Sequence, residues 1–137
     1  MLNDAADEFA IQGWSDSTLR LAVRTGFRCE YCGSDFFASL ENYYAFEVEH
    51  IVPRGRGAEL DDSPENLTVA CRTCNRLKRR WDPRTQAGEG AGRAKLIEAA
   101  RGYVSAQRKE KLERILGERE RALSILARMV NGASGVG

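Results

Sequence analysis

The chain has 137 residues, 42% of them hydrophobic, and carries a net charge of only +1. This length suits one domain with a small core, because only 8% of the residues are aromatic and 13 are glycine. No apolar run approaches the roughly 20 residues that span a bilayer, and the acidic N-terminus lacks the layout of a signal peptide, so we expect a cytoplasmic protein with no membrane partner.

The charge is divided unevenly along the chain. Residues 1–71 hold 5 Lys and Arg against 13 Asp and Glu, whereas residues 72–137 hold 16 against 7. Such an asymmetry is typical of proteins that bind a polyanion such as nucleic acid. Two complementary faces, or a basic helix facing solvent, would give the same counts, so the charge pattern alone leaves these alternatives open.

The N-terminal segment, residues 1–27, is expected to be helical. A short helix is expected over residues 4–12. A second helix has Ser15 or Asp16 as its cap and Gly26 just after its end. The apolar residues of this second helix share one face: Leu19, Ala22 and Val23.

The cysteines form two Cys-x-x-Cys pairs with none left over: Cys29 with Cys32, and Cys71 with Cys74. Gly33 after the first pair allows a tight turn in which backbone N–H groups point at the thiolates. In a reducing compartment, two such pairs are more typical of metal ligands than of disulfides. Buried free thiols and a redox dithiol are the alternatives. We predict a structural Zn²⁺ ion held by all four cysteines.

The segment after the first pair predicts a strand. Residues 34–42 are compatible with a short helix or a loop. From residue 43 to residue 52 the sequence YYAFEVEHIV alternates in the manner of a strand with one inward face, and Pro53 ends it.

A second strand and a helix are expected further along. Ser63-Pro64-Glu65 predicts a turn, and Asn66 then begins a strand over residues 67–70. The second cysteine pair leads into a helix over residues 75–81, which Asp82-Pro83 ends. The order is therefore a ββα unit with a cysteine pair at each end.

The C-terminal part of the chain favours helix. Residues 84–92 have loop composition, and residues 93–130 are rich in helix formers, with a break possible at Gly117. The apolar face of this extension is expected to pack on the domain or to pair with a second copy in a homodimer. Its 10 Lys and Arg against 5 Asp and Glu also suit a phosphate backbone, and the two roles are compatible.

The only histidine, His50, lies next to the carboxylate of Glu49. Hydrolysis of a phosphodiester needs a base that activates water, and a histidine with a pKa of about 6.5 suits that task near neutral pH. It also needs charge neutralisation, which a hard cation such as Mg²⁺ supplies. Adjacent residues of a strand point to opposite faces, so Glu49 and His50 do not serve one metal as paired ligands without a bend.

The ordered motifs Cys-x-x-Cys, acid-His-Ile-Val-Pro-Arg, Glu-Asn-Leu and Cys-x-x-Cys-Asn-x-x-Lys resemble the HNH endonucleases of the ββα-metal fold, over roughly residues 28–79. The resemblance implies an α+β fold with a zinc-stapled core (28–83), the N-terminal helical segment (1–27) and the C-terminal extension (93–130). It makes His50 the general base, which Asn66 orients, and makes Glu49 and Asn75 the ligands of a catalytic Mg²⁺ or Mn²⁺ ion. The residues expected to contact DNA are Arg54, Arg56, Arg76, Lys78, Arg79 and Arg80.

The family most often has aspartate where this chain has Glu49, which is one methylene longer. The resemblance therefore implies a metal-dependent DNA endonuclease in which metal preference or rate could differ. The alternatives are a zinc-stapled module that binds nucleic acid without cutting it, and a protein whose C-terminal helices assemble copies or dock to a larger complex. The sequence leaves open the DNA specificity and whether one or both strands are cut.

Overall fold

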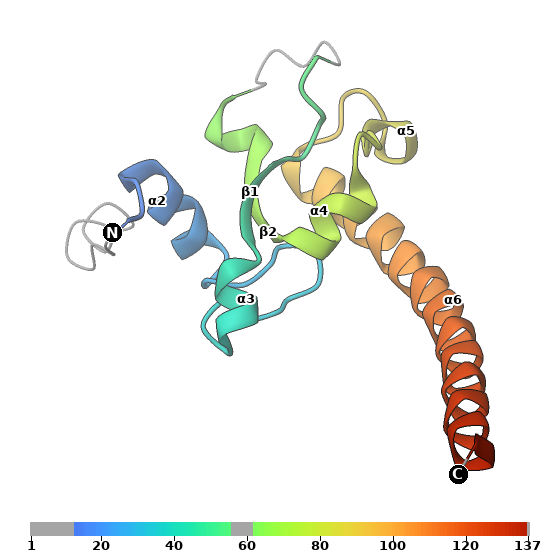
Figure 1. The fold of residues 1–137 in the computed structure, drawn as a ribbon. Helices are drawn as coiled ribbons and strands as arrows, with labels where there is room; N and C mark the ends of the chain where they lie inside the picture. The colour runs from blue at the N-terminus through green and yellow to red at the C-terminus, as the bar shows by residue number, and fades with distance from the viewer. Residues whose placement is uncertain (1–12, 56–61, 137) are drawn as a thin grey trace. The chain divides into compact units, whose positions relative to one another are not determined.

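The computed structural model describes residues 13–55 and 62–136, so the helix expected over residues 4–12 and the residue Arg56 lie outside it. The described residues form a mixed α and β fold with a two-stranded antiparallel sheet and a long C-terminal helix (Figure 1), and the predicted α+β class is confirmed. The chain divides into two compact units, which meet in the sequence at Ser105 and Ala106 and are described separately.

Helix α2 (Asp16–Arg24) begins as expected from its cap. The hydroxyl of Ser15 accepts a hydrogen bond from the backbone N–H of Thr18 at 3.2 Å, which satisfies one of the free donors of the first turn. Gly26, just past the end, adopts a φ of +67°, a conformation that glycine reaches without a steric penalty. The buried residues of α2 are Leu19, Leu21 and Ala22.

The sheet pairs strand β1 (Phe46–His50) with strand β2 (Leu67–Cys71). The antiparallel register places Phe46 opposite Cys71 and His50 opposite Leu67. The second cysteine pair thus begins where β2 ends, level with the start of β1, and His50 lies at the far end of the sheet.

The strand expected from residue 43 begins later than predicted. Residues 43 and 44 belong to helix α3 (Leu40–Tyr44), because the Ser39 side chain caps this helix by accepting from the N–H of Asn42 at 3.0 Å. The backbone N–H of Ala45 then closes the last turn onto Glu41. The cap at Ser39 therefore makes residues 43 and 44 helical, although tyrosine favours strands.

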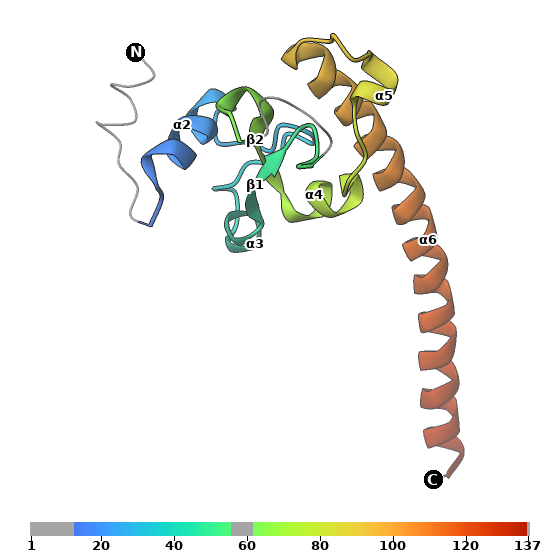
Figure 2. The same cartoon turned by 90° about the horizontal axis from the view of Figure 1, so that it is seen from above.

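A 3₁₀ turn, η1 (Pro64–Asn66), leads into β2, and helix α4 (Arg72–Lys78) follows β2 without a loop. Helix α4 starts three residues before the predicted position, because Cys71 serves as its cap. It packs against both strands (Figure 2). The segment expected to be a loop over residues 84–92 contains one short helix, α5 (Arg84–Ala87).

Helix α6 (Arg93–Val136) runs through Gly117 without a break. An interior glycine costs about 1 kcal/mol relative to alanine, which one position in so long a helix can absorb. Up to Ser105 the helix belongs to the first unit. There it contributes to a core shared with α2, the sheet and the cysteine pairs, through Ile97, Ala100 and Val104.

Candidate functional site

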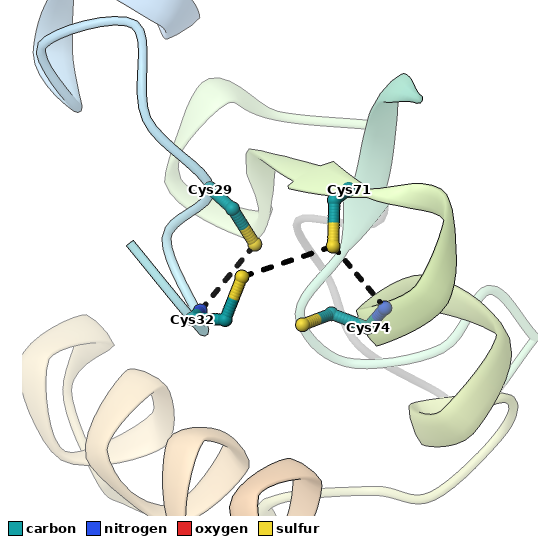
Figure 3. A group of neighbouring side chains, drawn as sticks. All are labelled: Cys29, Cys32, Cys71 and Cys74. Carbon is teal, nitrogen blue, oxygen red and sulfur yellow. Dashed lines mark hydrogen bonds between the residues drawn. The ribbon is translucent and has the colours of Figure 1, made fainter. Parts of the chain in front are cut away.

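The four cysteines of the two Cys-x-x-Cys pairs gather at one point (Figure 3). Their Sγ atoms all lie within 4.8 Å of one another, and the Sγ atoms of Cys32 and Cys71 are 3.8 Å apart. A tetrahedral zinc site with Zn–S bonds of about 2.3 Å has sulfur atoms about 3.8 Å apart. Both the donor type and the spacing therefore fit a structural zinc ion.

Each pair is folded in the same way. The N–H of Cys32 donates to the Sγ of Cys29 at 3.4 Å, and the N–H of Cys74 donates to the Sγ of Cys71 at 3.4 Å. In the first pair the turn is closed by Gly33, which has a φ of +78° and donates its N–H to the carbonyl of Cys29. These N–H groups stabilise charge on sulfur, as a thiolate site for zinc requires.

The thiols also influence one another. Hydrogen bonding with Cys29 lowers the pKa of Cys71 to about 6, and the same partner lowers the pKa of Cys32. Hydrogen bonds with Cys32 and Cys71 raise the pKa of Cys29. All four cysteines are free thiols, three of them buried, so the cluster is a set of closely coupled groups in which protons and a cation compete.

Two carboxylates of β1 contact successive turns of α4. Glu47 Oε1 accepts from the side-chain Nδ2 of Asn75 at 2.9 Å, and its Oε2 lies 3.2 Å from Nε of Arg72. Two residues on, Glu49 Oε1 accepts from Nζ of Lys78 at 3.0 Å. Side chains two residues apart share a face of β1, and side chains three residues apart share a face of α4. One face of the strand therefore contacts one face of the helix.

Glu49 is buried and engaged on both carboxylate oxygens. Lys78 contacts Oε1, and the hydroxyl of Tyr31, which lies between the first two cysteines, donates to Oε2. Burial raises the pKa of Glu49, an effect that the charge of Lys78 and the hydrogen bond from Tyr31 only partly oppose. Burial and the nearby Glu49 carboxylate raise the pKa of the Tyr31 phenol, so Tyr31 is a neutral donor.

The oxygen donors of Glu49 and Asn75 are of the type that Mg²⁺ or Mn²⁺ binds. In the structure, however, the two residues have different partners: Glu49 contacts Lys78, and Asn75 contacts Glu47. A divalent cation at Glu49 would have to compete with the Lys78 ammonium group at Oε1 or with the Tyr31 hydroxyl at Oε2. The two predicted ligands are therefore suited by their chemistry, although they are not assembled as one oxygen cluster.

His50 ends β1 with its side chain 27% exposed, and its Nε2 lies 3.0 Å from Oδ1 of Asp62. The same oxygen accepts from Nη2 of Arg54 at 2.6 Å. These contacts, with His50 first and Arg54 second, hold the pKa of Asp62 below its usual value, so Asp62 is a carboxylate at neutral pH. Sequence reasoning missed this partner, although Asp61-Asp62 is an acidic pair just before the turn that leads to Asn66.

Asn66, predicted to orient the imidazole, holds the backbone just beyond it. Its buried amide accepts from the N–H of Val52 at 2.8 Å and donates to the carbonyl of Val52 at 3.0 Å. The carbonyl of Asn66 also accepts from the N–H of Ile51 at 2.8 Å. Asn66 therefore fixes the turn that follows His50, which sets where the end of β1 lies.

The residues predicted to contact DNA separate into two groups. Arg76, Arg79 and Arg80 on α4 and the turn after it are exposed, as is Arg54. Lys78, from the same basic run, has a side chain that is 0% exposed. Its ammonium group is out of reach of solvent, so the prediction that Lys78 contacts phosphate does not agree with the structure.

The comparisons with known proteins agree with the residue pattern. The family model described as HNH endonuclease matches residues 29–80, which include both cysteine pairs, β1, β2 and α4. Neither the comparison with curated proteins nor that with solved structures gave a match. Residues 29–80, called the HNH segment below, match this family model, and they contain four cysteines positioned to form a zinc site.

Proposed function

We propose that this protein is a metal-dependent endonuclease that hydrolyses DNA phosphodiester bonds, with His50 as the general base. The observation that carries the proposal is the partly exposed imidazole of His50 at the end of β1, with Asp62 beside its Nε2. A family of nucleases matches the segment that contains it.

The contact with Asp62 suggests which atom acts. If Nε2–H donates to the Asp62 carboxylate, the neutral ring keeps its free lone pair on Nδ1. Nδ1 is then the atom that accepts a proton from water. The carboxylate also stabilises the imidazolium that results, as an acidic partner does in other histidine bases.

The proposed cofactors are structural Zn²⁺ at the four cysteines and catalytic Mg²⁺ or Mn²⁺ at Glu49 and Asn75. A divalent cation supplies neutralisation of the charge that develops on the phosphate and the leaving oxygen. The exposed Arg54, Arg76, Arg79 and Arg80 are proposed to contact the phosphates of the substrate, together with Arg56. The free thiols of the zinc cluster suit a reducing compartment, and we propose a cytoplasmic location.

The experiment is cleavage of supercoiled plasmid in a series of divalent metals by the wild type and His50→Ala. The wild type should convert the plasmid to nicked circles in Mg²⁺ or Mn²⁺, and His50→Ala should be slower by about 10² to 10⁴-fold. Arg20→Ala, a change at a partly exposed position of α2 outside the HNH segment, serves as a matched control. Equal cleavage by wild type and His50→Ala, or none in any metal, would refute the proposal.

A second candidate function is supported by the closed environment of Glu49. With both oxygens engaged by Tyr31 and Lys78, this carboxylate is part of a packed interior, which favours a zinc-stapled module that binds nucleic acid without cutting it. Such a module predicts salt-dependent binding and no effect of Asn75→Ala on any activity. Binding without cleavage in the plasmid experiment would favour it.

We also propose that the second unit mediates a homodimer. In the described part of this unit the helix exposes eight large apolar side chains, which an isolated helix cannot bury by itself. Because one ββα site cuts one strand, two copies would supply the two sites that a double-strand break requires. The exposed residues are Leu112, Ile115, Leu116, Leu123, Ile125, Leu126, Met129 and Val130.

No helix in the part of the chain that the structure describes is long and apolar enough to cross a bilayer.

A further inference from the structure

Lys78 is the last residue of α4, and its side chain is wholly buried. Its Nζ has two acceptors: Oε1 of Glu49 at 3.0 Å and the backbone carbonyl of His50 at 3.1 Å. The ammonium group therefore lies beneath the end of β1 and contacts the backbone of the proposed general base.

Burying a lysine is costly, because an ammonium group loses its hydration and regains it only through well-placed partners. A methionine or leucine would fill the same space without that cost. The site retains a lysine whose two acceptors belong to adjacent residues, Glu49 and His50. What a lysine provides here, and an apolar residue does not, is a donor both to the Glu49 carboxylate and to the carbonyl of His50.

The backbone around His50 is held from a second direction as well. Asn66 accepts from the N–H of Ile51 through its own carbonyl and pairs with Val52 through its side chain. Lys78 supplies the remaining contact, on the carbonyl of His50 itself. The strand end is thus fixed by α4 on one side and by the turn before β2 on the other.

We propose that Lys78 is the positioning residue of His50, and that it acts from inside the protein and makes no contact with a phosphate of the DNA. This inference rests on the proposed function, because it assigns the residue that presents the general base. It separates Lys78 from the arginines beside it: Arg76, Arg79 and Arg80 are exposed, whereas Lys78 reaches no surface.

The first test is kinetic and compares Lys78→Met with Arg76→Met, an exposed change on the same helix. A positioning residue predicts that kcat of Lys78→Met falls about 10 to 100-fold, the size of effect expected for displacement of a reacting group by about 1 Å. The affinity for DNA and its salt dependence should stay at wild-type values. Arg76→Met should instead weaken DNA binding and reduce the salt slope by about 0.9. If Lys78→Met does the same with kcat unchanged, the inference is overturned.

A second readout does not need activity. His50 is the only histidine of the chain, so its imidazole signals in a proton–carbon NMR spectrum are assigned without further variants. We expect these signals to shift or broaden in Lys78→Met and to remain in place in Arg76→Met. Unchanged His50 signals in a folded Lys78→Met protein would overturn the inference.

The double variant Lys78→Met/Glu49→Gln guards against loss of folding, because it leaves no unpaired charge in the interior. Its His50 signals should differ from those of Glu49→Gln alone, and identical spectra would count against Lys78. Lys78→Arg keeps a donor on a longer side chain, so its kcat should lie between the values of Lys78→Met and of the wild type. If the wild type cuts no DNA, the proposed function fails, while the NMR comparison still decides whether Lys78 positions the His50 ring.

Discussion

Lys78 and Glu49 form an ion pair that is closed to solvent, with Nζ and Oε1 3.0 Å apart and side chains 0% and 4% exposed. The residues come from α4 and β1, and Tyr31 of the first cysteine pair completes the cluster by donating to the other oxygen of Glu49. The pair therefore joins the three parts of the HNH segment: the first cysteine pair, the sheet and the helix.

Replacing one residue of this ion pair should destabilise the first unit strongly. Lys78→Met leaves the Glu49 carboxylate buried with only the hydroxyl of Tyr31, and we expect a loss of about 3–5 kcal/mol in the free energy of unfolding. Lys78→Met/Glu49→Gln should recover a large part of this loss, because neither residue is then charged. Urea unfolding of the wild type, the two single variants and the double variant measures the coupling. Additive effects of the two single changes would show that the pair does not act as a unit.

Asn66→Ala should destabilise the turn after β1. The change removes both side-chain hydrogen bonds to Val52 and leaves a buried N–H and a buried carbonyl without their partner. We expect a loss of about 1–3 kcal/mol in the free energy of unfolding. Asn75→Ala is the matched control. This half-buried amide donates to the partly exposed carboxylate of Glu47, so the loss of this hydrogen bond should lower the free energy of unfolding by less. Equal losses for the two variants would contradict the role assigned to Asn66.

Removal of zinc should unfold the first unit. Three of the four cysteines, Cys29, Cys71 and Cys74, lie in its core, and the free energy of zinc binding is part of the free energy of folding. The two tryptophans report on this unit, because Trp14 packs against Phe46 at a tilt and Trp81 stacks on Tyr103. A zinc-selective chelator should therefore shift the tryptophan fluorescence, and added zinc should reverse the shift. Depletion of Mg²⁺ alone should leave the fluorescence unchanged while it stops cleavage.

The stability of the zinc-bound protein should rise with pH between about 6 and 8. Zinc binds thiolates, so the zinc-bound fold carries thiolates where the unfolded state, with thiols of an ordinary pKa of about 8.5, carries protons. In the metal-free cluster the pKa of Cys71 is already lowered, by hydrogen bonding with Cys29, to about 6. Unfolding then takes up protons, and the stability is lost as the pH falls toward 6. Calorimetric melting at fixed zinc concentration measures the trend. A melting temperature that falls with rising pH over this interval would contradict the assignment of the cysteines as thiolate ligands.

The sequence predicted the features that depend on neighbours in the chain. The spacing of each Cys-x-x-Cys pair requires only a local turn, and the Ser15 cap requires only the first turn of α2. A strand was also recovered from a period of two, although it covers only Phe46–His50 of the predicted residues 43–52. These features are decided within about five residues, where composition and spacing carry the information.

The contacts that define the site could not be predicted in this way. Lys78 was assigned to the surface because it follows Arg76 in a basic run, and only tertiary packing shows that it faces β1. One signal was present: Cys74 and Lys78 are four residues apart, so they share the inward face of α4. The pairing of His50 with Asp62 spans a separation of 12 residues and has no comparable local signal.

The second unit should form a dimer in solution. Leu116, Leu123 and Val130 recur every seven residues, and Leu112 and Leu126 are spaced by fourteen, which is the pattern of a coiled-coil seam. This seam extends over about 27 Å of helix at 1.5 Å per residue. All of these side chains are exposed in the single chain, so association would remove them from water.

Analytical ultracentrifugation of the full chain over a range of concentrations tests this prediction. Wild type should sediment as a dimer that dissociates on dilution, because association depends on the concentration of protomers. Leu123→Glu places a charge in the seam and should give a monomer at all concentrations tested. Ser124→Glu introduces the same charge on the next residue, outside the seam, and should remain a dimer. A monomeric wild type, or the same behaviour in both variants, would show that this face does not bind a second copy.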